Sequence, residues 1–411
     1  MTVAAARRDG SLVQEARILA LVGAGHFFAH FYIIVLPPLF PLLHQEFGVS
    51  YAALGLIMTA MHVATGVTQV PVGILVDRFG SRRLLALGLL MMGGGMALAG
   101  IAGSYWSLVG FMAVVGIGNS VFHPADYAIM AAKIDHRRLG RAFSIHTSLG
   151  HVGWALAPVI VGGLTALWSW RAALVVVGLA GLAVMAAVLY QGRSLDIDAA
   201  RSDTPPSRGA AAPKSRWALL TSAPMLLFFA FMVLASMVNS GINNFSVSVL
   251  VSHYGVSLGG ATGVLTAYLT ASAVGILLGG VIADRVRRHE LVLMVGFLFS
   301  AGLLALVASV PLPFIAIGAV FVLAGGVLGS MRPSRDMMVT AIAPVGAVGT
   351  VFGFVTMGLN VGGAVAPVFF GWLIDRGSAT WVFYAAAILM LLALVSAAAA
   401  KARSVPVPTR G

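Results

Sequence analysis

Long apolar runs follow one another along the whole chain, separated by short polar stretches. Each run is about as long as a helical crossing of a lipid bilayer, which needs roughly 20 residues. A helix satisfies its own backbone polar groups, so it is the element expected inside lipid. The pattern predicts twelve spanning helices, near residues 17–43, 51–76, 84–102, 107–132, 142–167, 172–191, 218–251, 258–283, 291–310, 313–340, 349–374 and 381–400.

The same pattern argues against membrane strands. No run alternates apolar and polar residues over the length of a transmembrane strand, which disfavours a β-barrel. Glycine (49 residues) and proline (17 residues) occur inside many runs, and membrane helices tolerate both. The first run is too long for a signal peptide and has no convincing cleavage site, so we expect an uncleaved helix. The predicted fold class is an all-α polytopic membrane protein.

Composition agrees with a lipid environment. The 411 residues are 59% hydrophobic and 9% charged, with a mean hydropathy of +0.98. A soluble chain carries about 25% charged residues, so soluble enzymes, nucleic-acid binders and disordered scaffolds are poor interpretations. The chain has no cysteine, which excludes disulfides, thiolate metal sites and a cysteine nucleophile.

The basic residues indicate how the helices are oriented. They gather in alternate loops, at both termini and in one central linker, so that 21 of the 25 lie on one side of the predicted membrane. Arg171 and Arg376 lie on the other side. By the positive-inside rule both termini and the linker are cytoplasmic, as in a bacterial-type inner membrane protein. The net charge of +12 therefore reflects topology, and we expect no nucleic-acid partner.

The chain is divided by a single polar segment into two related halves. Residues 192–216 are rich in Asp, Ser, Pro and Arg, and separate an N-terminal bundle (1–191) from a C-terminal bundle (217–411), each with six predicted spans. NVGGAVAPV (360–368) echoes HVGWALAPV (151–159) at an offset of 209, and GGVIADR (279–285) echoes VGILVDR (72–78). Two pseudo-symmetric halves are typical of secondary transporters with a midplane site.

The loop after the second span carries the most specific motif. Its defined positions are Gly73, Asp77, Arg78, Gly80, Arg82 and Arg83. It resembles the GxxxDRxGxRR signature of the major facilitator superfamily, and the resemblance implies a cytoplasmic latch in which the carboxylate meets a helix N-terminus and the arginines. The second half repeats part of the motif at Asp284 and Arg285, with Arg287 where glycine is expected.

The fifth span contains a stripe of small residues and proline. Gly153, Pro158 and Gly162 resemble the antiporter motif of the superfamily's drug:proton antiporters, with Ala157 in place of the glycine before the proline. A similar stripe at Gly362 and Pro367 in the other half leaves a generic helix-packing seam as the alternative.

Three further stretches resemble one branch of the superfamily. Gly25-His26 followed by Pro37, Pro38 and Pro41, the segment Gly118 to Pro124 with its Phe-His-Pro, and residues 140–163 are together similar to fosmidomycin-resistance proteins. Ala125 and His30 stand where that branch usually carries acidic residues. The resemblance implies drug efflux.

Four of the 38 charged residues lie well inside predicted spans, namely Asp126, Arg332, Arg335 and Asp336. A charge in a membrane helix is costly unless it meets a partner or a cavity. At offset 209 Asp126 maps onto Arg335, on helices that line the central cavity in the superfamily. Two hypotheses follow. Asp126 and Arg335 form a structural ion pair, or the arginines bind an anionic substrate while Asp126 or Asp336 carries a proton.

Histidines and amides complete the candidates. His26 and His30 share one helix face and suit proton relay or anion binding, with packing as the alternative. Three more histidines are weaker candidates: His123, which we group with the proton carriers, His146 and His151. No further ligand lies near the pair in sequence, so we expect no metal. Asn243, Asn244 and Tyr127 are candidate substrate contacts, whereas hydrogen bonds or packing between helices explain such residues equally well.

The sequence predicts a transporter and not an enzyme. It contains no Walker loop and no dinucleotide fingerprint, so we expect no cofactor and a gradient as the energy source. The leading hypothesis is a proton-coupled antiporter that exports a drug or a small metabolite, for example an anionic one, and functions as a monomer. One alternative is a proton-coupled importer of a small carboxylate or phosphonate-like anion. Another is a transporter-like receptor, which the short loops disfavour.

Overall fold

The computed structural model describes residues 3–195, 220–342 and 348–403. Within these ranges the chain forms helices and no strand. Twelve helical segments are long and apolar enough to cross a membrane, beginning with residues 12–47 and ending with residues 381–400. The predicted fold class and the number of spans are therefore confirmed.

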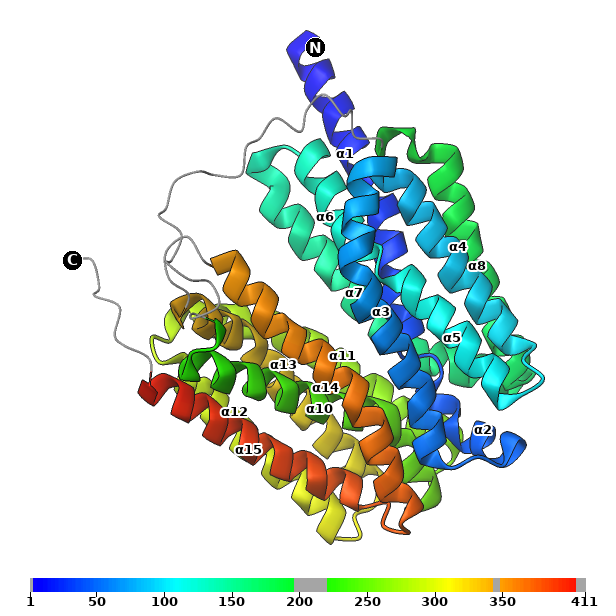
Figure 1. The fold of residues 1–411 in the computed structure, drawn as a ribbon, viewed down its shortest axis with the longest axis vertical. Coiled ribbons are helices and arrows are strands. Elements are labelled where there is room, and N and C mark those ends of the chain that lie inside the picture. Colours follow the sequence, from blue (N-terminus) through cyan, green and yellow to red (C-terminus); the bar gives the residue numbers. More distant parts are fainter. Residues whose placement is uncertain (1–2, 196–219, 343–347, 404–411) are drawn as a thin grey trace. The chain divides into compact units, whose positions relative to one another are not determined.

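The helices follow the predicted spans closely (Figure 1). In the first half they are α1 (Val3–Ile33), α2 (Phe40–Phe47), α3 (Tyr51–Phe79), α4 (Ser81–Gly100), α5 (Tyr105–Asn119), α6 (Phe122–Lys133), α7 (His136–Leu167) and α8 (Trp170–Gln191). In the second half they are α10 (Ala223–Ser252), α11 (Leu258–Arg285), α12 (His289–Ser309), α13 (Phe314–Ile342), α14 (Val348–Asp375) and α15 (Trp381–Arg403). Short 3₁₀ turns lie at Pro37–Leu39, between α1 and α2, and at Gly192–Leu195, after α8.

Two of the spans are interrupted helices. The first consists of α1 and α2 with a 3₁₀ turn that begins at Pro37. Proline removes a backbone donor and clashes with the preceding turn, so a continuous helix cannot pass through this stretch. The fourth span consists of α5 and α6, separated at Ser120 and Val121. The second break places Phe122, His123 and Pro124 in the first turn of α6, where proline is tolerated.

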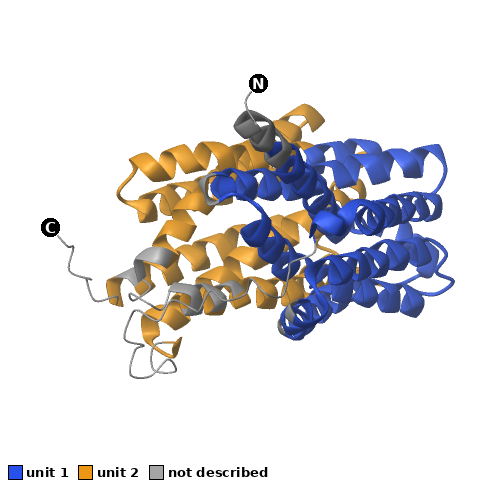
Figure 2. Ribbon diagram, turned by 90° about the horizontal axis from the view of Figure 1, so that it is seen from above, with its two compact units in different colours: residues 1–49, 56–205, 258–266 blue, residues 50–55, 206–257, 267–411 orange. Residues whose placement is uncertain are grey.

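The chain forms two compact units (Figure 2). Unit 1 contains residues 1–49, 56–205 and 258–266, and unit 2 contains residues 50–55, 206–257 and 267–411. The first residues of α3 thus group with unit 2, and the first residues of α11 with unit 1. Most of the predicted linker (192–216) falls within residues 196–219, which lie outside the described ranges.

The same helix pairs recur inside each unit. In unit 1, α1 packs on α7, and α4 packs on both α5 and α8. In unit 2, α10 packs on α14, and α12 packs on both α13 and α15. These are the corresponding spans of the two halves, since the first and fifth match the seventh and eleventh. The repeated packing supports the duplication inferred from the sequence.

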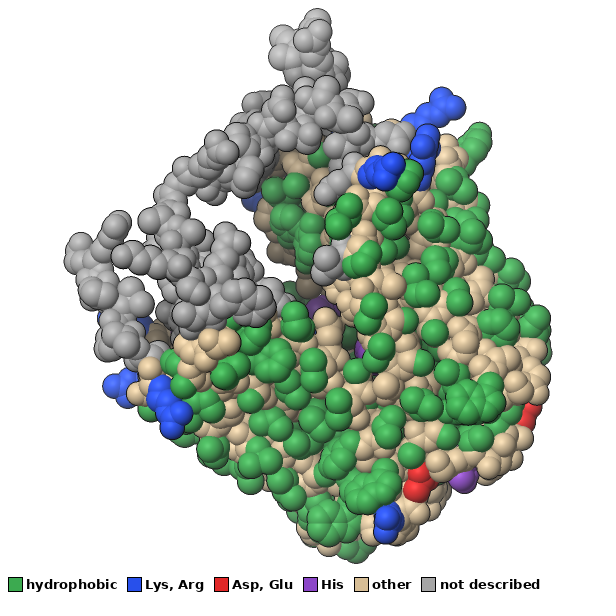
Figure 3. All heavy atoms as spheres, viewed as in Figure 1, with side chains coloured by type: hydrophobic (Ala, Val, Ile, Leu, Met, Phe, Trp, Pro, Cys, Tyr) green, Lys and Arg blue, Asp and Glu red, His purple; other side chains and the backbone are tan. Residues whose placement is uncertain are grey.

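Hydrophobic side chains are spread over much of the visible surface of the described residues (Figure 3). Among those most exposed are Val67 at 70% and Ile315 at 83%. In water such a surface would be an aggregation hazard. The exposed apolar helices therefore indicate that lipid is the solvent around the bundle.

Unit 2 contains a carboxylate that caps the start of α3. The Oδ1 and Oδ2 atoms of Asp375, the last residue of α14, accept hydrogen bonds from the backbone N–H groups of Tyr51 and Ala52, both at 2.8 Å. Ser50 Oγ accepts a third from Ala53 at 3.2 Å. These groups are among the N–H donors that the first turn of a helix leaves unsatisfied, and the negative charge also complements the helix dipole.

We expect Asp375→Ala to lower the free energy of unfolding by about 1–2 kcal/mol, as loss of a helix cap does. The measurement is thermal or denaturant unfolding of the purified protein in detergent. The matched control is Arg376→Gln at the neighbouring exposed position, which should change stability by less than about 0.5 kcal/mol. Equal effects of the two variants would contradict a capping role for Asp375.

Candidate functional site

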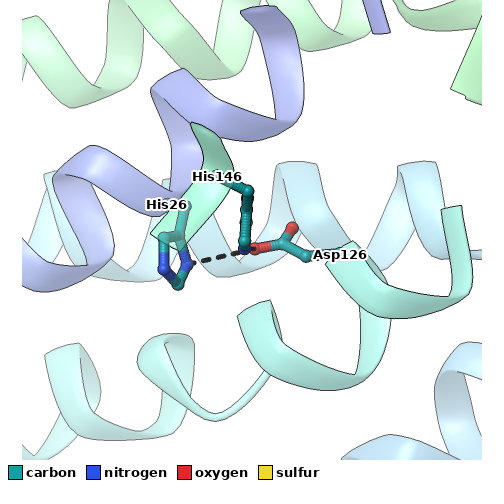
Figure 4. Close-up of side chains that lie close together, drawn as sticks. All are labelled: His26, Asp126 and His146. Carbon is teal, nitrogen blue, oxygen red and sulfur yellow. Dashed lines mark ion pairs between the residues drawn. The ribbon is translucent and has the colours of Figure 1, made fainter. Parts of the chain in front are cut away.

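A carboxyl group lies at the centre of unit 1. Asp126 on α6 is 0% exposed, and its Oδ2 atom lies 3.3 Å from Nδ1 of His26 on α1 and 3.4 Å from Nε2 of His146 on α7 (Figure 4). His26 and His146 are themselves 3% and 0% exposed. Their rings stack on each other with centroids 3.8 Å apart. We call His26, Asp126 and His146 the buried triad.

The polar atoms of the triad make close contacts but lack hydrogen bonds. Within the described part of the chain, neither carboxylate oxygen of Asp126 has a hydrogen-bond partner, and the same holds for Nδ1 of His26 and both ring nitrogens of His146. A buried carboxylate without compensation costs far more than a buried neutral group. The triad therefore suits either a neutral carboxylic acid or a carboxylate beside a protonated imidazole. Both forms need a bound proton.

Local sequence explains how three helices bring these side chains together. The break before α6 starts a new helix at Phe122, which places Asp126 within its first two turns. On α7, Gly150 leaves room for imidazoles, because a Cβ there would lie 2.8 Å from the His26 ring and 3.0 Å from the His30 ring. A Cβ on Gly153 would collide with the carbonyl oxygen of Phe27. Small residues on α7 thus let α1 approach closely enough for the triad to form.

Further rings surround the triad on the same three helices. His30 lies 4.5 Å from His26 between ring centroids, and 4.8 Å from Trp154. His123 lies 5.5 Å from His26 and packs near Tyr127, with nearly parallel rings 6.0 Å apart. His123 and Tyr127 are exposed, whereas His30 and Trp154 are half-buried. The buried triad therefore lies beneath a layer of more accessible rings.

The triad also has the composition of a metal ligand set. His26, Asp126 and His146 each offer one ligand atom, and these atoms lie within 4.8 Å of one another. A structural zinc site normally has four protein ligands, and a catalytic one has three with an open position. Within the described part of the chain no fourth His, Cys, Asp or Glu joins this group. The expectation that the chain binds no metal stays a prediction.

Unit 2 has its own charged group on α13. Arg335 donates from Nε to Oδ1 of Asp336 at 2.9 Å, and its Nη2 lies 2.8 Å from the same oxygen. The Nη2 atom of Arg332 lies 3.5 Å from Oδ1 of Asn239 on α10. The Asp336 side chain is 50% exposed, in contrast to that of Asp126. This group is a cationic site whose adjacent carboxylate remains accessible.

A family model described as Major Facilitator Superfamily matches residues 22–261 and 229–411. The chain belongs to the major facilitator superfamily. Members of this family are transporters, and this protein is accordingly a multi-pass membrane transporter with a lipid bilayer and a small-molecule substrate as its partners. The expected superfamily membership is confirmed.

Curated relatives resemble the chain over most of its length. It is 28% identical over 389 residues to the uncharacterized MFS-type transporter YfnC of Bacillus subtilis (strain 168), covering 92% of this chain and 91% of that protein. It is 25% identical over 388 residues to the fosmidomycin resistance protein of Escherichia coli (strain K12), with the same coverage. It is 27% identical over 355 residues to the probable sulfoacetate transporter SauU of Cupriavidus necator (strain ATCC 17699 / DSM 428 / KCTC 22496 / NCIMB 10442 / H16 / Stanier 337), covering 82% of each.

Solved structures support the fold. A bacterial homolog of the human lysosomal transporter Spinster has a TM-score of 0.79 at 16% identity, covering 95% of this chain and 97% of that one. A mutant of the nucleoside transporter NupG has a TM-score of 0.77 at 14% identity, with coverage of 95% and 99%. At these identities the likeness concerns the fold alone.

The structure gives Asp126 partners that the sequence did not select. One of the two sequence hypotheses pairs Asp126 with Arg335, and the structure places Asp126 beside His26 and His146. Asp126 and Arg335 belong to different units, so their pairing stays a prediction. His146 was only a weak candidate, because sequence spacing alone does not show which residues of α1, α6 and α7 meet. The feature of the sequence that points to His146 is a titratable side chain inside an apolar helix.

The predicted substrate amides on α10 differ in their surroundings. Asn244 is buried and donates to Ser240 Oγ at 2.9 Å, within its own helix. Asn239, on the same helix but not among the predicted contacts, donates to the carbonyl of Ala235 at 2.9 Å. Among the described residues no hydrogen-bond partner meets the buried Oδ1 atom of Asn243, and its contact with substrate stays a prediction.

The predicted latch residues lie at the junction of α3 and α4. Gly80 has a φ of +88°, which favours glycine at this turn. The Arg78 guanidinium lies 5.4 Å from the Phe79 ring centroid, and Arg82 donates to the carbonyl of Leu189 at 3.4 Å. The side chain of Asp77 lies outside the described residues. In unit 2, Asp284 and Arg285 are exposed at the end of α11.

The small-residue seam has a clear packing role in unit 1 and an analogous one in unit 2. Pro158 lies inside α7 and Pro367 inside α14. A Cβ on Gly362 would collide with the carbonyl of Val233 on α10, as one on Gly153 would collide with α1. Both seams therefore allow the first helix of a unit to approach its fifth. The helix-packing alternative thus has direct support, and an antiporter role remains a hypothesis.

We expect Gly153→Ala to destabilise the protein by about 1–3 kcal/mol, because the new methyl group overpacks the contact between α1 and α7. The check is unfolding of the purified variant in detergent. Gly163→Ala on the same helix is the matched control, since a Cβ there would have no atom within 4 Å. If both variants unfold alike, the close approach at Gly153 is not a constraint.

Proposed function

We propose that this transporter is a proton-coupled antiporter that exports a drug or a small organic anion. It works by rocking one six-helix half against the other around a midplane site. The observation that carries the proposal is the buried triad, where a carboxyl group without hydrogen bonds lies within 3.4 Å of two imidazoles. Such a group needs a proton to stay buried and can lose it when the site meets water.

The exposure of His123 supports the assignment of Asp126 as the proton site. His123 contacts the His26 ring and is itself exposed, so it offers a path between water and Asp126. Histidine both accepts and donates protons near neutral pH. In this proposal His123 relays a proton to the triad, and Asp126 holds it while the transporter changes conformation.

Arg332 and Arg335 are the proposed anion contacts. A guanidinium binds carboxylate, phosphonate or sulfonate oxygens through two parallel donors. A bound anion at Arg335 would compete with Asp336, which would then take up a proton once its partner is occupied. Asp336 is therefore the second proton carrier in the proposal, and Asn243 and Asn244 are neighbouring candidates for substrate contact.

The names of the relatives are compatible with this substrate class. One is a fosmidomycin resistance protein, and another is a probable sulfoacetate transporter. The resistance function of the first favours export. The second keeps the alternative of a proton-coupled importer of a small carboxylate or phosphonate-like anion, since Arg332 and Arg335 favour an anion in either direction.

The remaining features fit the same cycle. The junction of α3 and α4, with Asp77, Arg78 and Arg82, forms a cytoplasmic latch, and Asp284 and Arg285 form a weaker copy. The protein resides in a bacterial-type inner membrane with both termini cytoplasmic, as the placement of basic residues favours. It functions as a monomer.

We expect Asp126→Asn to reduce substrate-dependent proton flux by at least about tenfold, because an amide cannot carry the proton. Flux is measured in proteoliposomes with fosmidomycin, sulfoacetate, simple carboxylates and a cationic dye as candidates. Exchange of labelled substrate at equal pH on both sides should persist, which separates coupling from folding. Glu290→Gln, outside the site, is the control. Unchanged flux in Asp126→Asn and in Asp336→Asn would remove both acids from the coupling role.

We expect Arg335→Gln to raise the KM for an anionic substrate by about tenfold or more, because a charge-assisted pair is lost. Arg335→Lys should give an intermediate value, since lysine keeps the charge but not the planar fork. Initial rates of uptake into proteoliposomes provide the measurement, with the exposed Arg287→Gln as control. An unchanged KM in Arg335→Gln would exclude this arginine as the anion contact.

A further inference from the structure

Five rings form a continuous layer over the buried triad. They are contributed by three helices of unit 1, and we call them the ring layer: His30, His123, Tyr127, His151 and Trp154. Adjacent members lie within ring-contact distance. His151 lies 5.6 Å from Trp154 and 6.3 Å from His30, and His30 lies 6.2 Å from His123, all measured between centroids.

The ring layer differs from a packed aromatic core in its accessibility. Tyr127 is 45% exposed and His123 is also exposed, while His30, His151 and Trp154 are half-buried. Directly beneath, the triad residues are nearly inaccessible. Large aromatic side chains in a core are usually fully buried, as Phe31 and Tyr32 are on α1. Part of the ring surface of the layer is therefore accessible to a ligand.

The chemistry of the layer selects a ligand class. His30 and His123 can supply N–H donors for carboxylate or other oxyanion oxygens, whereas Nδ1 of His151 donates to the carbonyl of Thr147 at 2.9 Å. The indole and phenol supply flat apolar faces. The acidic side chain that lies beneath these rings is Asp126, which is inaccessible. An organic cation therefore could not reach this carboxylate. A planar acid would find both donors and stacking surfaces.

The layout of the layer places donors and flat faces side by side. Trp154 contacts both His30 and His151 edge to face, and the centroids of the two imidazoles lie 6.3 Å apart, so the three rings form one cluster. Flat ligands gain from offset stacking or edge-to-face contact with such rings, whereas puckered rings of the same size make fewer close contacts. The layer thus distinguishes ligands by planarity in addition to charge.

We propose that the ring layer is a subsite for a planar, conjugated organic acid, whose ring packs against Trp154 and His151 while its carboxylate accepts hydrogen bonds from His30 and His123. This inference rests on the proposed function, since the ligand is taken to be the transported anion. It adds that the substrate is flat and unsaturated and that unit 1 recognises this property through its rings.

The test compares two probes of equal charge and similar size. Benzoate is planar, and cyclohexanecarboxylate is puckered. Equilibrium binding to the purified full chain in detergent, at one fixed pH and without a gradient, should favour benzoate by about tenfold, as expected for several ring contacts. Equal affinity for the two acids, or no binding of benzoate, would overturn the proposal.

Variants at Trp154 test whether this residue causes the higher affinity for the planar acid. Trp154→Leu should abolish the difference between the two acids, and Trp154→Phe should retain most of it, because phenylalanine keeps a flat face. The control is Trp168→Leu, at an exposed position just after α7, which should leave the preference intact. Tyr127→Leu provides a second, exposed position in case Trp154→Leu fails to fold. A preference that survives both Trp154→Leu and Tyr127→Leu contradicts the assignment.

The binding test is independent of proton coupling. The preference for planar acids is measured as binding at equilibrium, whereas the role of Asp126 is measured as proton flux. A chain that prefers benzoate but whose proton flux depends on neither Asp126 nor Asp336 would refute the proposed function and leave the subsite standing. A chain with Asp126-dependent flux and no preference for planar acids would refute the subsite alone.

Discussion

The burial of one carboxyl group constrains the organisation of unit 1. Asp126 is inaccessible, lacks hydrogen bonds, and has two imidazoles within 3.4 Å. In an apolar interior a carboxylate is stable only with a proton or a cation beside it. Three helices must therefore meet at one point, with their titratable side chains facing each other. Such a cluster is an expensive way to hold helices together, and this cost is the reason to look for a function in it.

Close helix packing is what makes the cluster possible. Gly150 and Gly153 on α7 remove the side chains that would hold α1 away, and the break between α5 and α6 allows a new helix to begin next to them. In membranes, where apolar burial gives little driving force between helices, small residues and van der Waals contact take over that role. The seam that resembles an antiporter motif therefore has a physical task in this protein. It positions His26 and His30 against the helix that carries His146.

The two units use the same scaffold with different chemistry. Corresponding helix pairs pack in each unit, and Gly362 repeats in α14 the close approach that Gly153 makes in α7. Yet unit 1 carries a buried acid among histidines, and unit 2 carries two arginines with an accessible acid. Duplication has thus preserved the packing while the polar side chains diverged. The interpretation we favour is that unit 1 handles the proton and recognises a flat acid through its rings, while the arginines of unit 2 provide further contacts for an anion.

Sequence alone determined the class of the protein and the positions of its spans, because a bilayer requires apolar helices of a certain length and the charges mark their ends. It also identified Asp126, Arg332, Arg335 and Asp336, since charges inside a span are conspicuous. Only the tertiary structure decided that Asp126 meets His26 and His146. Side-chain partners across helices depend on which faces pack together and how closely. The small residues of α7 set that distance, and no spacing along the chain records it.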